Sequence, residues 1–205
     1  MRKRLLGGIA SPLLALLLVA MLPLQAEASV TSFGAKLTSQ SQPANAEGGY
    51  PCSEFNGIPE NSNCTWVSVQ AYHNGGHVRA PKTGTINKLK LVSCVGGSFR
   101  LQFARVSGRK AMIVRSGPTI KYKADPQDVC GGDNGDHYIV QSFTINVHVN
   151  KGDYIAIQTR STGAMYCSGG NGTYVYTPPL PVGGAFTQAT DAYSCNMLIQ
   201  LFYAS

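Results

Sequence analysis

Acidic residues are scarce in this chain, which has 10 Asp and Glu against 17 Lys and Arg and a formal net charge of +7. No acid occurs between Asn61 and Ala124, a stretch that contains eleven basic residues. Cations at this density attract anionic partners and repel cationic ones. The charge balance therefore favours an anionic ligand.

Motifs of the common catalytic families are also absent, with no G-x-S-x-G elbow, no H-E-x-x-H helix and no P-loop. The histidines occur in different turns and strands, and only His73 and His77 are close in sequence. These two could converge on a metal across residues 74–76, or form a solvated loop pair. The sequence predicts a binding protein, not an enzyme.

Apolar runs long enough to span a membrane are absent after residue 24. Residues 1–28 have a basic start, an apolar stretch and small residues at Ala26 and Ala28, which is typical of a secretory signal peptide cleaved before Ser29. The alternative is an uncleaved anchor, because the apolar residues up to Leu24 reach the roughly 20 that span a bilayer. We expect a protein secreted to the extracellular space or the cell wall, with no transmembrane segment after cleavage.

Cysteine is limited to six residues in the exported part, and no two are within ten positions of each other. This spacing does not fit the close ligand pairs of a zinc site, whereas an oxidising compartment lets the thiols form three disulfides. Six cysteines allow many pairings. Proximity in sequence favours Cys52 with Cys64, Cys94 with Cys130, and Cys167 with Cys195.

Helical periodicity is almost absent, and alternation of apolar and polar residues dominates from residue 65 onward. Leu89 and Leu91 point one way while Lys88 and Lys90 point the other, and the final strand is expected over residues 196–203 with four apolar residues on one side. The pattern predicts an all-β, antiparallel two-sheet sandwich of about eight strands, jelly-roll-like and disulfide-stabilised. Residues 51–205 would form this domain, after a flexible lead-in at 29–50 with an edge strand at 33–37.

A resemblance to a protein family rests on five segments: FGAKL (33–37), NCTWVSV (63–69), GTINKLKL (84–91), SFRLQFARV (98–106) and FTINVHVNKGDYIAIQT (143–159). In this order, with a closing apolar strand, they resemble secreted actinobacterial jelly-roll β-sandwich proteins of unassigned function. A strand, a Gly-Asp turn and another strand also occur in tumour-necrosis-factor-like jelly rolls. The resemblance implies an extracellular sandwich and supplies no catalytic residues.

Basic residues at outward strand positions predict a polyanion-binding face formed by Lys88, Lys90, Arg100, Lys121 and Lys123. The alternative is a solubilising surface whose charges are spread over both sheets. Nucleic acid would fit the charge, but export favours anionic wall polymers or acidic glycans.

Two loop regions suggest further ligands. The glycine-rich residues 125–136 contain Asp125, Asp128, Asp133 and Asp136, which predict a calcium site without EF-hand spacing, or otherwise a polar loop pinned by Cys130. In the Gly- and Pro-rich residues 163–181, Tyr166, Tyr174 and Tyr176 could present their rings to carbohydrate, or pack under the loop.

These features together predict a secreted, non-enzymatic module that binds anionic envelope polymers or carbohydrates through its surface. A structural or protein-interaction sandwich that oligomerises is the alternative within binding. An envelope-polymer hydrolase is the alternative from another class.

Overall fold

Strands and the turns between them make up the described part of the chain. The computed structural model describes residues 31–37, 50–52, 59, 62–71, 76–93, 95–124, 140–167 and 172–204, and the predicted signal peptide at 1–28 lies outside them. Every pairing between named strands in these residues is antiparallel. The predicted all-β antiparallel class is therefore confirmed. Eight of the fifteen strands in the described residues have four or more residues, in line with the prediction of about eight strands.

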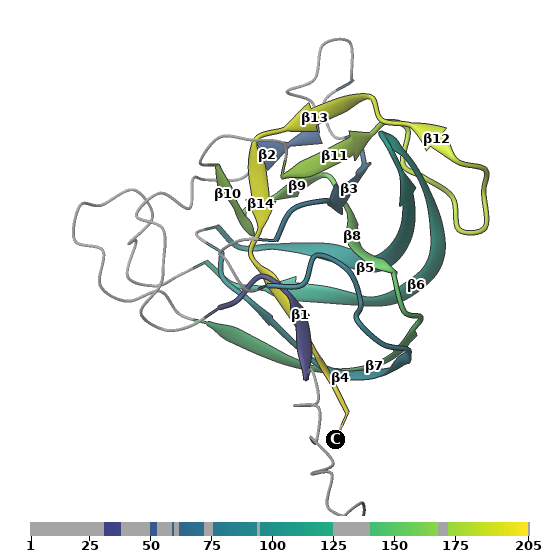
Figure 1. Cartoon of the computed structure of the whole chain (residues 1–205). Helices are drawn as coiled ribbons and strands as arrows, with labels where there is room; N and C mark the ends of the chain where they lie inside the picture. The colour runs from purple at the N-terminus through teal and green to yellow at the C-terminus, as the bar shows by residue number, and fades with distance from the viewer. Residues whose placement is uncertain are drawn as a thin grey trace, which may run out of the picture.

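The smaller of the two main sheets has four strands and lies at the bottom of Figure 1. Its order is β1 (Ser32–Gly34), β15 (Ile199–Tyr203), β4 (Gly84–Leu91) and β7 (Gln141–Val149). Lys88 lies opposite Phe202 and Ile86 lies opposite Tyr203, so a β-bulge gives β4 one residue more than β15 at this point. Ile86 and Leu89 therefore both face the core although they are three positions apart.

The larger sheet has seven strands and curls through the middle and top of Figure 1. Its order is β12 (Thr187–Gln188), β6 (Lys110–Tyr122), β5 (Gly97–Ser107), β8 (Tyr154–Thr159), β3 (Cys64–Ser68), β11 (Thr173–Tyr176) and β13 (Asp191–Tyr193). Two short pairs lie beside these sheets: β2 (Tyr50–Pro51) with β9 (Ser161–Thr162), and β10 (Met165–Cys167) with β14 (Cys195–Met197).

The two main sheets enclose the principal core. Both contribute side chains to one buried cluster, which includes Phe33, Trp66, Ile86, Leu89, Phe99, Leu101, Phe103, Ile155, Ile157 and Leu201. The chain passes repeatedly between the sheets, since β3, β5, β6 and β8 belong to the larger one and β4, β7 and β15 to the smaller one. The result is a jelly-roll-like sandwich.

A second, smaller core lies on the other face of the seven-stranded sheet. Val67, Ala104, Ile113 and Ala156 alternate along their strands with residues of the principal core and pack with Leu180. Leu180 belongs to residues 177–190, which join β11 to β13 and cross this face. Its N–H donates to the Thr65 hydroxyl oxygen (3.0 Å). Part of the larger sheet is therefore apolar on both faces.

A buried carboxylate organises the tight turn between β7 and β8. Asp153 is fully buried, its Oδ2 accepts the Asn150 N–H (2.7 Å), and Arg105 Nε lies 2.8 Å from its Oδ1. Gly152, at φ +87°, donates its N–H to the Ala80 carbonyl (2.8 Å). Burial of a charge is costly without such partners, so Asp153 joins this turn to β5.

The N-terminal edge strand is confirmed, because β1 pairs with β15 and buries Phe33. The sandwich thus extends into the residues predicted as a lead-in. The single final strand predicted over residues 196–203 is wrong. The chain changes partners at Leu198, whose N–H donates to Ala164 and whose carbonyl accepts the Val92 N–H. Apolar alternation continues across this break, so the pattern does not reveal it.

The first predicted disulfide is confirmed. Cys52 and Cys64 are bonded, with 5.8 Å between their Cα atoms. Cys195 is also disulfide-bonded and lies opposite Cys167 in the β10–β14 register, which is the neighbourhood that the predicted pairing with Cys167 requires. Cys94 and Cys130 lie outside the described residues.

Candidate functional site

The polar half of the seven-stranded sheet's outer face carries the candidate site. Beyond the cluster around Leu180, the outward positions change from apolar to polar, and Ser98, Arg100 and Thr119 are exposed there. Strand alternation produces this arrangement, because the intervening residues Phe99 and Ile120 point into the principal core. The polar side chains therefore lie on strands whose opposite face is packed into the principal core.

These side chains line a cleft of about 390 Å³. The polar groups that matter for its chemistry are Asn63, Ser98, Arg100, Thr119, Gln158 and Arg160. The cleft opens beside the disulfide-bonded start of β3, since Asn63 immediately precedes Cys64.

Strand register brings these residues together from distant parts of the chain. Arg100 on β5 lies opposite Thr119 on β6 and opposite Gln158 on β8. Ser98 lies opposite Lys121, so this exposed ammonium group lies beside the cleft. The Thr159 hydroxyl donates to the Ser98 carbonyl (2.8 Å). This bond joins the end of β8 to the start of β5 beside the cleft.

A buried glutamine orients one of the lining amides. Gln102 is 2% exposed, and its Nε2 donates to Gln158 Oε1 (3.4 Å). With that oxygen engaged, the Gln158 NH₂ group is the part left to meet a ligand. Gln102 Oε1 is buried without a hydrogen-bond partner.

The electrostatic character of the cleft is cationic. Arg100, Arg160 and the adjacent Lys121 are exposed, and none of the described residues that line the cleft is acidic. In the described residues the single salt bridge is Arg105 with Asp153, outside this cleft. Guanidinium groups match oxyanions in a planar, bidentate geometry, so the arrangement can bind phosphate, sulfate or carboxylate groups.

A groove of about 700 Å³ continues from the cleft toward the four-stranded sheet. It runs between β6 and β7, with Ile120 and Phe143 at its base and Ser142 and Thr144 among its polar lining. Thr119 lines both the cleft and the groove. A ligand could thus extend across β8, β5 and β6 toward β7.

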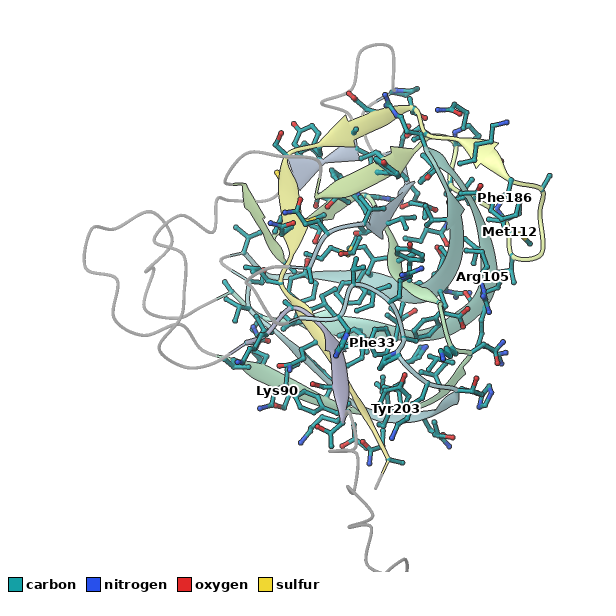
Figure 2. All side chains as sticks on the ribbon, in the orientation of Figure 1. Phe33, Lys90, Arg105, Met112, Phe186 and Tyr203 are labelled. Carbon is teal, nitrogen blue, oxygen red and sulfur yellow. A yellow bond between two sulfur atoms is a disulfide. The ribbon has the colours of Figure 1, made fainter. Side chains whose placement is uncertain are left out.

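The five residues predicted to form one polyanion-binding face do not share a sheet, and this prediction is corrected. Lys88 and Lys90 lie on β4, with their Nζ atoms 4.8 and 5.2 Å from the Phe202 ring centroid, and Figure 2 shows Lys90 on the outer side of the four-stranded sheet. Arg100 and Lys121 face outward from the seven-stranded sheet. Lys123 follows β6, and its N–H donates to Gln141 Oε1 (3.0 Å).

The physical reason for the split is the path of the chain after β4. β4 pairs with β15 and β7, whereas β5 enters the other sheet. β4 and β5 are consecutive in sequence, yet their outward residues point to opposite sides of the sandwich. The predicted alternative, in which the charges are spread over both sheets, therefore describes the positions of these five residues correctly.

The predicted calcium ligands Asp125, Asp128, Asp133 and Asp136 lie outside the described residues, as does His73. Within the described ranges, no group of three or more His, Cys, Asp or Glu side chains could hold a metal ion.

The predicted tyrosine platform is also corrected. Tyr174 and Tyr176 do share a face of β11, but Tyr176 is 1% exposed and belongs to the second core. Its hydroxyl donates to the Arg109 carbonyl (3.4 Å), and burial raises its pKa. Tyr174 packs against the same cluster, with the Arg109 guanidinium 6.0 Å from its ring centroid. The rings pack under residues 177–190 because the outer sheet face is apolar here; the Tyr166 side chain lies outside the described residues.

Sequence reasoning identified Arg100 and Lys121 but missed Arg160, Gln158 and Asn63. Alternation along β8 was a usable signal for two of these, because Gln158 and Arg160 occupy the positions opposite in direction to Ile155 and Ile157. Asn63 lies just before β3, so alternation within a strand could not place it.

The fold and the cleft together define a jelly-roll-like sandwich with a cationic, donor-lined surface site. No protein-family model, curated protein or solved structure matches this chain. None of the described segments is a helix of the length and apolar character needed to cross a membrane.

Proposed function

We propose that this chain is a secreted, non-enzymatic module that binds anionic polymers of the cell envelope in the cleft around Arg100 and Arg160. The observation that carries the proposal is the pairing of two exposed guanidinium groups with hydrogen-bond donors in a cleft whose described lining residues include no acid. Such a set favours ligands rich in acceptor oxygens and negative charge.

The spacing of the cations supports a polymer over a single small anion. Arg160 follows β8, Arg100 lies on β5 and Lys121 on β6, and these three strands are neighbours in this order. Adjacent strands are about 4.8 Å apart, so the three cations cover roughly 10 Å across the sheet. A linear polyanion that crosses the strands would meet them in succession and continue into the groove beside β7.

Binding assays with soluble polyanions test the proposal. The probes are polyphosphate, polygalacturonate and neutral dextran, measured by calorimetry at low and high salt. R100Q/R160Q should weaken polyphosphate binding about tenfold or more, because each lost guanidinium removes charge-assisted hydrogen bonds. Salt should weaken binding of the unaltered chain, since the Debye length falls from about 10 Å at 0.1 M to about 3 Å at 1 M.

The matched control is K88Q/K90Q, which removes the same charge from the opposite sheet. We expect this variant to retain its affinity within about twofold, as screening limits the effect of distant exposed charges. Equal losses in the two variants would mean that net charge alone attracts the polymer. Equal binding of dextran and polyphosphate would refute an anionic ligand.

A further inference from the structure

A projecting loop between residues 180 and 187 displays apolar side chains to solvent. Val182 is 52% exposed and Phe186 46% exposed, and they are two of the three large hydrophobic side chains exposed in the described residues. Figure 1 shows this loop extending beyond β12, and Figure 2 shows Phe186 and Met112 at the same edge of the molecule. The two exposed side chains therefore occupy one protruding site.

Backbone hydrogen bonds fix the path of the loop. Gly183 donates its N–H to the Ile113 carbonyl (2.8 Å), and Ala189 donates to the Arg109 carbonyl (2.9 Å). Gly183 has φ +74°, and Gly184 donates to the Pro181 carbonyl (3.4 Å), as in a type II turn that places Val182 at its corner. The backbone is thus bonded to the β5–β6 hairpin within the loop, at Gly183, and just after β12, at Ala189, while Val182 and Phe186 stay exposed.

Two basic residues lie where the loop joins the β5–β6 hairpin. β12 lies opposite the start of β6, with Gln188 beside Lys110, and Arg109 is the residue whose carbonyl accepts the Ala189 N–H. Arg109 and Lys110 are exposed, and no described carboxylate forms a salt bridge with either. Two exposed cations therefore lie beside the attachment of the loop to β6.

Size and charge together indicate which partner fits this tip. A stable protein interface needs about 800 Å² from each partner, whereas one aromatic side chain supplies roughly 150–250 Å². Contact with a bilayer surface needs a smaller apolar area, since apolar side chains enter the headgroup boundary while nearby cations attract anionic lipid. Arg109 and Lys110 match that charge requirement.

We infer that the 180–187 loop is a membrane-contact site, in which Val182 and Phe186 insert into an anionic lipid surface and Arg109 and Lys110 bind its headgroups. This surface is separate from the Arg100–Arg160 cleft. The protein would then bind its polymer close to a membrane surface.

Tryptophan fluorescence of the F186W variant tests this inference directly. The chain has one tryptophan, and Trp66 is fully buried, so its emission supplies a constant background. Vesicles of phosphatidylglycerol and phosphatidylcholine in equal parts should shift the new emission to the blue, and vesicles of phosphatidylcholine alone should not. R109Q/K110Q in the F186W background should weaken partitioning about thirtyfold, or about fivefold per cation.

V95T is the matched control in a vesicle-sedimentation assay, because Val95 is the third exposed large hydrophobic residue and lies outside the loop. V182S/F186S should abolish sedimentation with anionic vesicles, whereas V95T should not.

The absence of a blue shift at millimolar anionic lipid would overturn the inference. A blue shift that appears without lipid when the protein concentration is raised would show that a second copy of the chain covers the tip, and it would contradict the inference. R100Q/R160Q should leave the F186W shift intact, so failure of the polymer site is distinguishable from failure of this one.

Discussion

At the scale of single residues, two buried glutamines have opposite hydrogen-bonding environments. Gln102 donates to Gln158 but has an unsatisfied buried oxygen. Gln200 is engaged at both ends, since its Oε1 accepts the Leu37 N–H (3.3 Å) and its Nε2 donates to the Ser32 hydroxyl (3.1 Å). An unsatisfied buried acceptor destabilises a fold, whereas a satisfied amide stabilises it. Gln102 is therefore retained at a cost in stability, which fits a role in orienting Gln158.

The Q102L variant should separate stability from binding. Removing the unsatisfied oxygen should raise the free energy of unfolding by about 1 kcal/mol, measured by urea denaturation. Polyphosphate affinity should fall roughly twofold to tenfold, because Gln158 loses the bond that orients its NH₂ group. Q200L is the control and should lower stability without changing affinity. A stability loss in Q102L equal to that in Q200L would contradict the proposed role.

The alternation pattern in the sequence predicted the direction in which a strand side chain points, but not which residues lie beside it. Alternation correctly assigned Arg100 and Lys121 to outward positions, since the direction of a strand side chain depends on its own backbone. Burial of Gln102 was not predictable in this way. It sits on the same outward face as Arg100, and its exposure depends on β6 and β8 beside it.

At the scale of elements, residues 177–190 stabilise the seven-stranded sheet by covering its apolar outer half. Leu180 packs there with Val67, Ala156 and Tyr176. The Thr177 N–H donates to the Thr190 hydroxyl (2.9 Å), so the two ends of the segment are joined. Strands with apolar residues on both faces need such a cover, and the tyrosines predicted to bind sugar are part of this packing.

The L180A variant should destabilise the fold by about 2–4 kcal/mol, because it leaves a cavity between the segment and the sheet. V182A, in the same segment but exposed, should change stability by less than about 0.5 kcal/mol. Urea denaturation of both variants gives the comparison. A loss below about 0.5 kcal/mol in L180A would show that the segment contributes little to the sheet.

At the scale of the whole molecule, several tyrosine hydroxyls link stability to alkaline pH. Burial raises the pKa of Tyr122, Tyr176 and Tyr203 above the usual value near 10. The Tyr203 hydroxyl also donates to the Lys82 carbonyl (2.7 Å). Each group keeps its proton in the folded chain at a pH where the unfolded chain has lost it, so the folded state binds more protons above pH 10.

The melting temperature should therefore fall as the pH rises above about 10, and this tyrosine effect should be absent below that value. Scanning calorimetry from pH 8 to 12 measures the fall, and absorbance at 295 nm should show these phenols ionising together with unfolding. Y122F removes one of the linked groups and should reduce the slope. Full phenol ionisation at pH 11 in a chain that remains folded would contradict the linkage.

The sequence by itself determined the class of fold and the local direction of most side chains. Period-2 alternation is a property of each strand alone, so the strands around Leu89, Leu101 and Ile157 and their buried faces were readable. The Cys52–Cys64 bond was also readable, because its partners are only 12 residues apart. Export and the polymer ligand stay predictions.

Only the tertiary structure decided which charges meet. Leu89 pairs with Leu201 on one side and Phe143 on the other, and no local pattern specifies pairings between residues so far apart in the chain. Those pairings place β4 and β5 in different sheets, which separates Lys88 from Arg100, and they bring Arg160 to Arg100 through β8. Membership of a sheet is set by burial of the whole core, so a charged surface can be located only after the strands have been paired.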